Sequence, residues 1–291
     1  MHIYSCISRR IIALLVLFTL AYTNNAPNIT YSNEKKIMVD SVRCATPVPT
    51  IEQQYRVQSR IQEWTRLGRT TSRNVITIPV AVHVVRGDNG EWDVTDIQIQ
   101  DQIDVLNAAF LSQNFQFTLT STDRTDNSEW SQHSYGSSEE ITMKSSLAIS
   151  PETTLNMYFC NIGGGILGYA TFPDYYDESD TRHGVVCAYG TVPGGIAYPY
   201  DGGDTGTHEV GHYVGLRHVW GDGDCTVDDF VSDTPNQSGP NYDCDENADT
   251  CPSDPGNDPV HNFMNYGDDL CLTEFTAGQS SRAHSIMSLY K

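Results

Sequence analysis

The sequence has few basic residues. It contains 17 Lys and Arg against 37 Asp and Glu, which gives a formal charge of −20. A chain this acidic is repelled by phosphate backbones and anionic lipids, so nucleic acid and anionic membranes are excluded as partners. The acidic residues are concentrated between Asp222 and Asp269, which suggests bound cations.

The sequence also lacks a hydrophobic run long enough to cross a bilayer. The apolar run at 11–22 has 12 residues and follows a polar start that ends in two arginines, whereas a membrane-spanning helix needs about 20. This pattern is typical of a signal peptide rather than an anchor. We predict a signal peptide over 1–26, cut after Ala21 or Ala26, and a secreted, extracellular protein without membrane insertion. The oligomeric state is not indicated.

Either cut removes Cys6 and leaves seven cysteines in an oxidising compartment, where thiols normally pair. One cysteine is therefore left over. Export also makes Asn28 and Asn236 candidate glycosylation sites, because each begins an Asn-X-Ser/Thr triplet, although such triplets often arise by chance.

The domain organisation follows from a change of composition near residue 73. Residues 27–72 are polar, with helical spacing over 51–67 but too few large apolar residues for a domain, and we interpret them as a propeptide. From Val75, the segment ITIPVAVHVV predicts a buried strand, and GDNG at 87–90 predicts its turn. The catalytic domain is thus predicted over 73–291.

The elements of this domain alternate between strand and helix. Thr95 or Asp96 can cap a helix whose apolar residues recur at spacings of four, three and four. Further strands are predicted at 115–120, 155–162 and 184–189, and a last helix at 275–290. We therefore expect an α+β or α/β half with a twisted mixed sheet, followed by a loop-rich C-terminal half.

The segment THEVGHYVGLRH at 207–218 carries the chemistry. His208 and His212 lie four residues apart, so on a helix both imidazoles project from one face and can hold one zinc ion. Glu209 lies about 100° round the helix, where it flanks the open metal position and can take a proton from water. Gly215 can adopt a positive φ that ends the helix and returns His218 as the third ligand.

Two alternatives compete with a catalytic zinc site. An ordinary helix with satisfied histidines is disfavoured, because five fixed residues at fixed offsets rarely occur by chance. A zinc site without catalysis is the more serious alternative. Glu209 argues against it, because a structural site closes four ligands around zinc and needs no acid beside them.

The extended motif is the metzincin signature, which predicts a turn containing Met beneath the metal. NFMNYGD at 262–268 supplies that turn. Met264 would form the floor under the histidines. By resemblance to metzincins with Tyr at this offset, Tyr266 would stabilise the oxyanion of the tetrahedral intermediate. The alternative is that both side chains serve only the core.

With these motifs in view, the chain resembles the pappalysin family of metzincins, and its ulilysin-like members most. The resemblance runs from about Ile76 to the C-terminus. It implies a metzincin-type α+β catalytic domain with an upper sheet, a zinc helix at its base and a loop-rich subdomain below the cleft. The segments that carry it are HEVGHYVGLRHVWGD, DTP at 233–235, FMNYGDD, FTAGQ at 275–279, GYATFP at 168–173 and VPGG at 192–195.

The resemblance also implies two disulfides, Cys225 with Cys251 and Cys244 with Cys271. Cys160 and Cys187 remain, and because they lie in two predicted strands of one sheet they could form a third bridge, which is not a recognised feature of the family. Cys44 is then the odd cysteine.

Cys44 stands in the propeptide sequence Arg43-Cys44-Ala45-Thr46. Family propeptides carry a similar Arg-Cys-Gly-Thr, whose thiolate occupies the open zinc position, so the resemblance implies a latent zymogen released by a cut among Arg66, Arg69 and Arg73. Ala45 departs from the family glycine and would cost about 1 kcal/mol if the backbone there needed a positive φ. The alternative is an unpaired or mispaired cysteine.

Two further assignments concern the acidic residues. Asp229, Asp233 and Thr234 offer hard oxygens within six residues, and similar family segments bind calcium; the alternative is a solvated loop. Asp269 matches a position that faces the specificity pocket of ulilysin-like enzymes. A carboxylate there would favour Arg, then Lys, after the scissile bond; the alternative is that Asp268 and Asp269 serve calcium or solvent.

The sequence therefore predicts zinc-dependent hydrolysis of peptide bonds in extracellular proteins or peptides. The rival reading, from another functional class, is a secreted zinc-stabilised binding protein or toxin that uses its cleft without cutting. Glu209 is the residue that separates the two.

Overall fold

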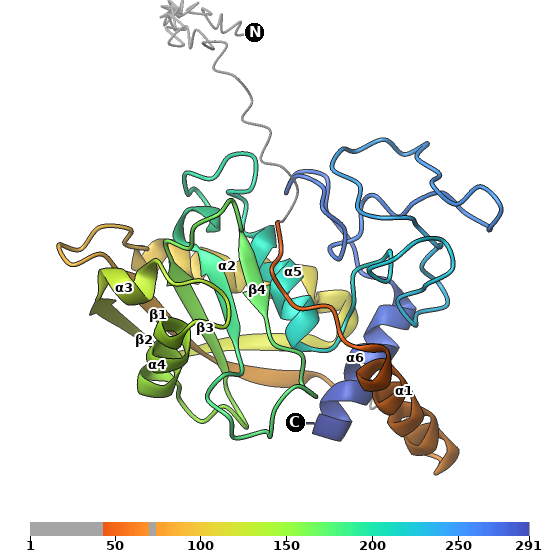
Figure 1. Cartoon of the computed structure of the whole chain (residues 1–291), viewed down its shortest axis with the longest axis horizontal. Coiled ribbons are helices and arrows are strands. Elements are labelled where there is room, and N and C mark those ends of the chain that lie inside the picture. The colour runs from red at the N-terminus through yellow and green to blue at the C-terminus, as the bar shows by residue number, and fades with distance from the viewer. Residues whose placement is uncertain (1–42, 70–73, 291) are drawn as a thin grey trace, which may run out of the picture. The chain divides into compact units, whose positions relative to one another are not determined.

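The computed structural model describes residues 43–69 and 74–290 (Figure 1). The predicted signal peptide, the sequon at Asn28 and the candidate cut at Arg73 lie outside these residues. In the ranges that are described, none of the helices combines the length and the apolar composition needed to cross a bilayer.

A five-stranded mixed sheet forms the centre of the described domain (Figure 1). Its strand order is β2-β1-β3-β5-β4, with all neighbours parallel except β4, which runs antiparallel to β5. The predicted mixed sheet is confirmed. The strands are β1 (Ile76–Arg86), β2 (Phe115–Asp126), β3 (Leu155–Cys160), β4 (Gly168–Ala170) and β5 (Val185–Ala188).

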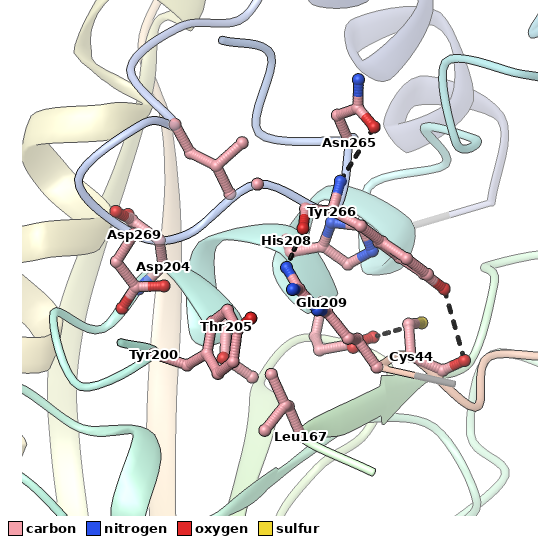
Figure 2. Close-up of a pocket in the computed structure, with 13 residues that line it drawn as sticks. Cys44, Leu167, Tyr200, Asp204, Thr205, His208, Glu209, Asn265, Tyr266 and Asp269 are labelled. Carbon is pink, nitrogen blue, oxygen red and sulfur yellow. Dashed lines mark hydrogen bonds between the residues drawn. The ribbon is translucent and has the colours of Figure 1, made fainter. Parts of the chain in front are cut away.

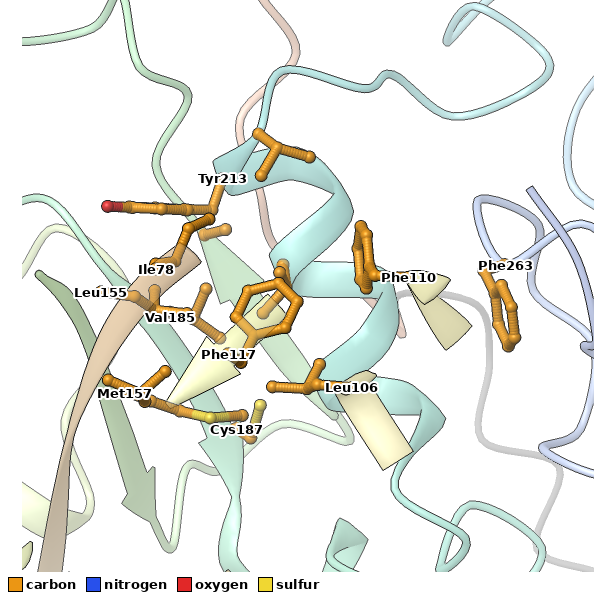
Figure 3. Packing of buried hydrophobic residues seen from close by; sticks show 14 of the residues in the cluster. Ile78, Leu106, Phe110, Phe117, Leu155, Met157, Val185, Cys187, Tyr213 and Phe263 are labelled. Carbon is orange, nitrogen blue, oxygen red and sulfur yellow. The ribbon is translucent and has the colours of Figure 1, made fainter. Parts of the chain in front are cut away.

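The main core lies between one face of the sheet and two helices, α2 (Asp96–Ala109) and α5 (Asp204–Tyr213). Of the two predicted capping residues, Thr95 or Asp96, it is Thr95 that caps α2, and it does so with a full capping box. Leu106 of α2 and Phe110, the residue that follows α2, belong to this core (Figure 3), and the Phe110 and Phe117 ring centres are 5.3 Å apart. Helix α5 packs against α2 and against strands β4 and β5.

The opposite face of the sheet is covered by α3 (Ser128–Ser131) and α4 (Ser138–Leu147). Neither helix was predicted. Here Lys144 of α4 is fully buried and pairs with Glu140, Nζ to Oε1 2.7 Å. A buried charge requires such a partner, so the pair is a structural feature of this face.

The predicted bridge between Cys160 and Cys187 is wrong. Both cysteines are free and buried. In the parallel ladder of β3 and β5, Cys160 aligns with Ala188 while Cys187 aligns with Phe159. Successive side chains of a strand point to opposite faces, so the two thiols lie on opposite sides of the sheet and cannot meet.

The C-terminal half after α5 has few regular elements until α6 (Ala277–Tyr290), as predicted. Two disulfides stabilise its loops, Cys225–Cys251 and Cys244–Cys271, and both predicted pairs are confirmed.

Residues Ile51–Arg66 of the predicted propeptide form a helix, α1, that lies beside α6 (Figure 1). Val57 of α1 packs in a small apolar cluster with Ile286 and Tyr290 of α6. The predicted propeptide segment therefore contacts the rest of the domain through apolar side chains of α1.

Candidate active site

Helix α5 and the turn after it position the motif residues. The whole of Thr205–Tyr213 is buried. A Cβ at Gly211 would lie 2.3 Å from the Met264 sulfur, so glycine allows the helix to rest directly on the turn beneath it. Gly215 has φ +94°, the positive value predicted for the residue that turns the chain back toward His218.

The three predicted histidine ligands converge. Each Nδ1 donates a hydrogen bond to an oxygen: His208 to the Phe263 carbonyl at 2.7 Å, His212 to the Leu216 carbonyl at 2.8 Å, and His218 to the Asp222 carboxylate at 2.5 Å. These bonds leave the Nε2 lone pairs free to face one another. The Nε2 atoms of His212 and His218 are 3.2 Å apart.

This donor set fits a zinc ion. The His208 Nε2 is buried without a hydrogen-bond partner, which marks a position where a ligand contact is missing. Burial lowers the pKa of His208 to about 3 and that of His212 well below its usual value, so both imidazoles stay neutral. Neutral imidazoles with their Nδ1 protons fixed by oxygens are typical zinc ligands.

Cys44 completes the cluster. Its sulfur and one nitrogen from each of His208, His212 and His218 all lie within 4.8 Å of one another. One thiol and three imidazoles are four donors of the types that zinc prefers, so together they could hold the ion without an open position.

Glu209 lies between this cluster and β4, and it is almost completely buried. Its Oε2 accepts hydrogen bonds from the Thr46 hydroxyl at 3.0 Å and the Cys44 thiol at 3.4 Å. Burial raises the pKa of Glu209 to about 8. Gly168 allows this approach, because a Cβ there would lie 2.8 Å from the Glu209 Cγ.

The Met-containing turn lies where it was predicted. Met264 is fully buried against Gly211 beneath the histidines. The Tyr266 hydroxyl lies 3.4 Å from the His218 Nε2 and donates to the Cys44 carbonyl at 3.5 Å. The phenol is therefore placed at the cluster.

The segment around Cys44 lies along the edge of β4. The Leu167 amide donates to the Arg43 carbonyl at 2.8 Å, and the Ala45 amide donates to the Gly168 carbonyl at 2.9 Å. Cys44 forms a parallel bridge with Gly168. Ala45 does not have a positive φ, so replacing the family glycine with alanine introduces no left-handed strain.

A pocket opens beside His208 and Glu209, and Asp204 and Asp269 lie at its end opposite Cys44 (Figure 2). Asp269 accepts hydrogen bonds at Oδ2 from the amides of Gly202 at 2.6 Å and Asp204 at 3.4 Å. Burial raises the pKa of Asp269 to about 6. Asp269 thus lines this pocket and also fixes the turn that begins α5, and its predicted role in substrate selection stays a prediction.

The predicted calcium residues are only partly brought together. The Thr234 hydroxyl donates to Asp229 at 2.8 Å, and the other Asp229 oxygen is buried without a partner. Asp233 instead accepts from the Thr276 hydroxyl at 2.7 Å and the Gly278 amide at 2.8 Å, at the start of α6. Calcium binding stays a prediction.

Two residues of the site were not predicted. Thr46 contacts Glu209 across 163 residues of sequence, a contact that no local pattern reveals. Asp222 holds His218, and its place four residues beyond that histidine was a usable signal.

Comparison with known proteins decides the family. Residues 151–288 match the peptidase M43 family, described as pregnancy-associated plasma protein-A. An extracellular metalloprotease of Podospora anserina is 38% identical over 265 residues, which cover 85% of this chain and 89% of that protein. The chain belongs to the pappalysin family. It is a metalloprotease of that family, and the resemblance inferred from the motifs is confirmed.

Other relatives extend the comparison. An extracellular metalloprotease of Colletotrichum graminicola is 39% identical, with 85% of this chain and 91% of that protein covered. Among solved structures, a promirolysin mutant from Tannerella forsythia has a TM-score of 0.71 at 32% identity and covers 83% of this chain and 92% of its own. Mature mirolysin with a cleaved peptide has a TM-score of 0.66 at 34% identity and covers 73% of this chain and 91% of its own.

Proposed function

We propose that this pappalysin is a secreted zinc metalloendopeptidase, made as a latent zymogen, that cleaves extracellular proteins or peptides. The observation that carries the proposal is the convergence of three imidazoles, one with an unpartnered buried Nε2, next to the carboxyl group of Glu209. His208, His212 and His218 would hold the metal. Zinc bound there supplies a Lewis acid that polarises a carbonyl and lowers the pKa of water.

Glu209 is the general base in this proposal. Its buried carboxylate takes the proton of the attacking water and passes it to the leaving amine. The Tyr266 hydroxyl, beside His218, donates a hydrogen bond to the oxyanion that develops on the scissile carbonyl. Asp222 keeps His218 in the tautomer that presents Nε2.

Latency is assigned to the segment before residue 73. Cys44 occupies the position that water and substrate would need, and Thr46 engages the general base. Burial and the Glu209 carboxylate raise the pKa of the Cys44 thiol well above its usual value, whereas a metal cation at the histidines favours the thiolate. The promirolysin structure covers 83% of this chain, whereas mature mirolysin covers 73%. This difference supports a propeptide role for the N-terminal segment.

The proposed processing follows the predicted boundaries. A signal peptide over 1–26 is removed on export, the propeptide over 27–72 is cut among Arg66, Arg69 and Arg73, and residues 73–291 form the active enzyme. The names of the relatives, extracellular metalloproteases, support secretion.

For substrates, we propose a preference for Arg, then Lys, directly after the scissile bond. Asp269 lines the pocket beside His208 and Glu209, and a carboxyl group there supports the binding of a basic side chain. Charge-assisted hydrogen bonds to a carboxylate contribute roughly 1.5 to 3 kcal/mol, enough for about tenfold discrimination.

The proposal is tested by alkylation of the full-length proform with a maleimide. With one equivalent of zinc, Cys44 should be protected; after chelation of zinc it should react, and activity of the matured enzyme should be lost and then restored by zinc. Equal labelling of Cys44 with and without zinc would reject the switch, and full activity without metal would reject the metalloenzyme.

A further inference from the structure

Helix α1 presents an apolar stripe to α6 (Figure 1). Val57 of α1 is buried and packs with Ile286 and Tyr290 of α6, and Ile61 packs against the same cluster. Val57 and Ile61 are four residues apart, so both side chains lie on one face of α1. The contact therefore has the form of an amphipathic helix laid against an apolar surface.

Two arginines lie beside this stripe, one helical turn apart. The Arg56 Nη2 is 3.3 Å from the carboxylate of Asp174, a side chain that is only 9% exposed. The Arg60 guanidinium carbon lies 4.2 Å from the ring centre of Tyr290, and its Nη2 donates to the Leu289 carbonyl at 3.3 Å. Helix α1 is therefore held by charge as well as by apolar packing.

The groove that these two arginines line is acidic. Besides Asp174, it is lined by Asp177 and Glu178, and by Asp180, which pairs with Arg182. Loss of α1 removes both arginines and leaves these carboxylates beside the apolar face of α6. The vacated surface suits a basic amphipathic helix.

This surface is separate from the metal cluster but close to it along the chain. Thr46 contacts Glu209, and Thr50 caps α1. Four residue steps join these two contacts, which is at most about 14 Å. Between them, the Tyr175 hydroxyl donates to the Pro47 carbonyl at 2.5 Å. One short segment can thus reach both sites at once.

The contacts of α1 do not depend on the bond that activation would break. The proposed cut lies among Arg66, Arg69 and Arg73, at or beyond the last residue of α1. A cut there breaks the covalent link and leaves the packing of Val57 and the ion pair of Arg56 in place. The excised segment must then leave two sites, and joining two contacts in one chain strengthens the binding of both.

We propose that α6 and the acidic loop at 173–180 form a helix-binding site of the mature enzyme, separate from the metal site, whose ligand is a basic amphipathic helix. The excised propeptide is that ligand and stays bound through α1 after the cut. Activation then requires dissociation of α1 as well as proteolysis. The inference rests on the proposed function and deepens it, because it names a second contact that regulates the same active site.

The test uses mature enzyme, residues 73–291, and a labelled peptide of residues 49–69, which lacks Cys44. Ser59→Lys, joined to Glu63 by a lactam, holds the peptide helical, since both positions are exposed and an isolated helix of this length is marginal in water. Fluorescence anisotropy should show saturable binding. Val57→Ala should weaken binding about five- to tenfold, because it removes buried methyl groups while favouring the helix.

The ion pair is tested from both sides. Arg56→Gln in the peptide and Asp174→Asn in the enzyme should each weaken binding about two- to fivefold, and together no more than one alone. Arg66→Gln is the matched control, because that side chain is 73% exposed and pairs with Glu63 of its own helix in the proform. Absence of binding, or equal binding of the wild-type and Val57→Ala peptides, would overturn the site.

A longer peptide of residues 43–69 tests regulation, because it reaches both sites. It should inhibit cleavage of a short peptide substrate, and Val57→Ala should raise the concentration needed by the factor found in the binding assay. Equal inhibition by the two peptides would refute the regulatory role of α1. An enzyme that binds the 49–69 peptide but cleaves no substrate would instead contradict the proposed function, so the two failures are distinguishable.

Discussion

The Thr46 hydroxyl offers the sharpest test of how the propeptide segment blocks the general base. It donates to the Glu209 Oε2 at 3.0 Å and accepts from the Ala170 amide at 2.8 Å. Thr46→Val keeps the shape of the side chain but deletes both bonds, and Thr46→Ser keeps both. The comparison therefore isolates the hydroxyl.

The expected magnitude follows from these two bonds. Because burial raises the pKa of Glu209 to about 8, both bonds are counted as neutral, and a neutral hydrogen bond contributes about 0.5 to 1.5 kcal/mol. Their joint loss weakens the closed state by about 1 to 3 kcal/mol, which is at least about fivefold in the population of the open state. Cleavage that follows rapid opening tracks that population.

The assay is the initial rate at which purified full-length proform converts to mature enzyme. Thr46→Val should convert at least about fivefold faster than wild type, and Thr46→Ser should convert within about twofold of it. Thermal melting of the zinc-loaded proforms checks that each variant is folded. A folded Thr46→Val proform that converts at the wild-type rate would refute the assigned role of Thr46.

Three further predictions concern stability. Lys144→Met leaves the Glu140 carboxylate buried without its partner, so urea unfolding should show a free energy of unfolding that is lower by about 3 to 5 kcal/mol. Adding Glu140→Gln to Lys144→Met should restore part of this loss, and no recovery in the double variant would contradict the prediction. Gly211→Ala places a Cβ 2.3 Å from the Met264 sulfur and should cost about 1 to 3 kcal/mol and weaken zinc binding, measured by titration with a competing chelator. Burial raises the pKa of Asp229 to about 7, above its unfolded value of about 4. Without calcium, the contribution of Asp229 to the free energy of unfolding therefore falls as pH rises from about 4 to 7. Asp229→Asn should flatten the dependence of the free energy of unfolding on pH over this range.

Local patterns in the sequence were sufficient to predict the metal-binding helix and the longer strands and helices. His208, Glu209 and His212 lie within one helical turn and a half, so their spacing alone determines their relative directions. Strand β1 was predicted because its apolar residues are continuous, and α2 because a capping residue precedes a regular stripe.

Features that depend on long-range pairing could not be predicted in the same way. Strand β4 has three residues, too few to show a period, yet it carries the contacts of Cys44 and Glu209. The faces of Cys160 and Cys187 depend on the alternation of two strands, which requires their exact limits and register. The two disulfides were predicted by family resemblance, since cysteine counting leaves their connectivity open.

The central claim, that Glu209 is the base of a zinc endopeptidase, is tested most directly by Glu209→Gln. Both proforms are loaded with zinc, cut with added trypsin that is then inhibited, and compared on a casein-like substrate. We predict equal zinc content in the two proteins and cleavage by wild type alone, because the amide retains the shape of the side chain but cannot accept the proton. Equal residual cleavage by wild type and Glu209→Gln would contradict the account.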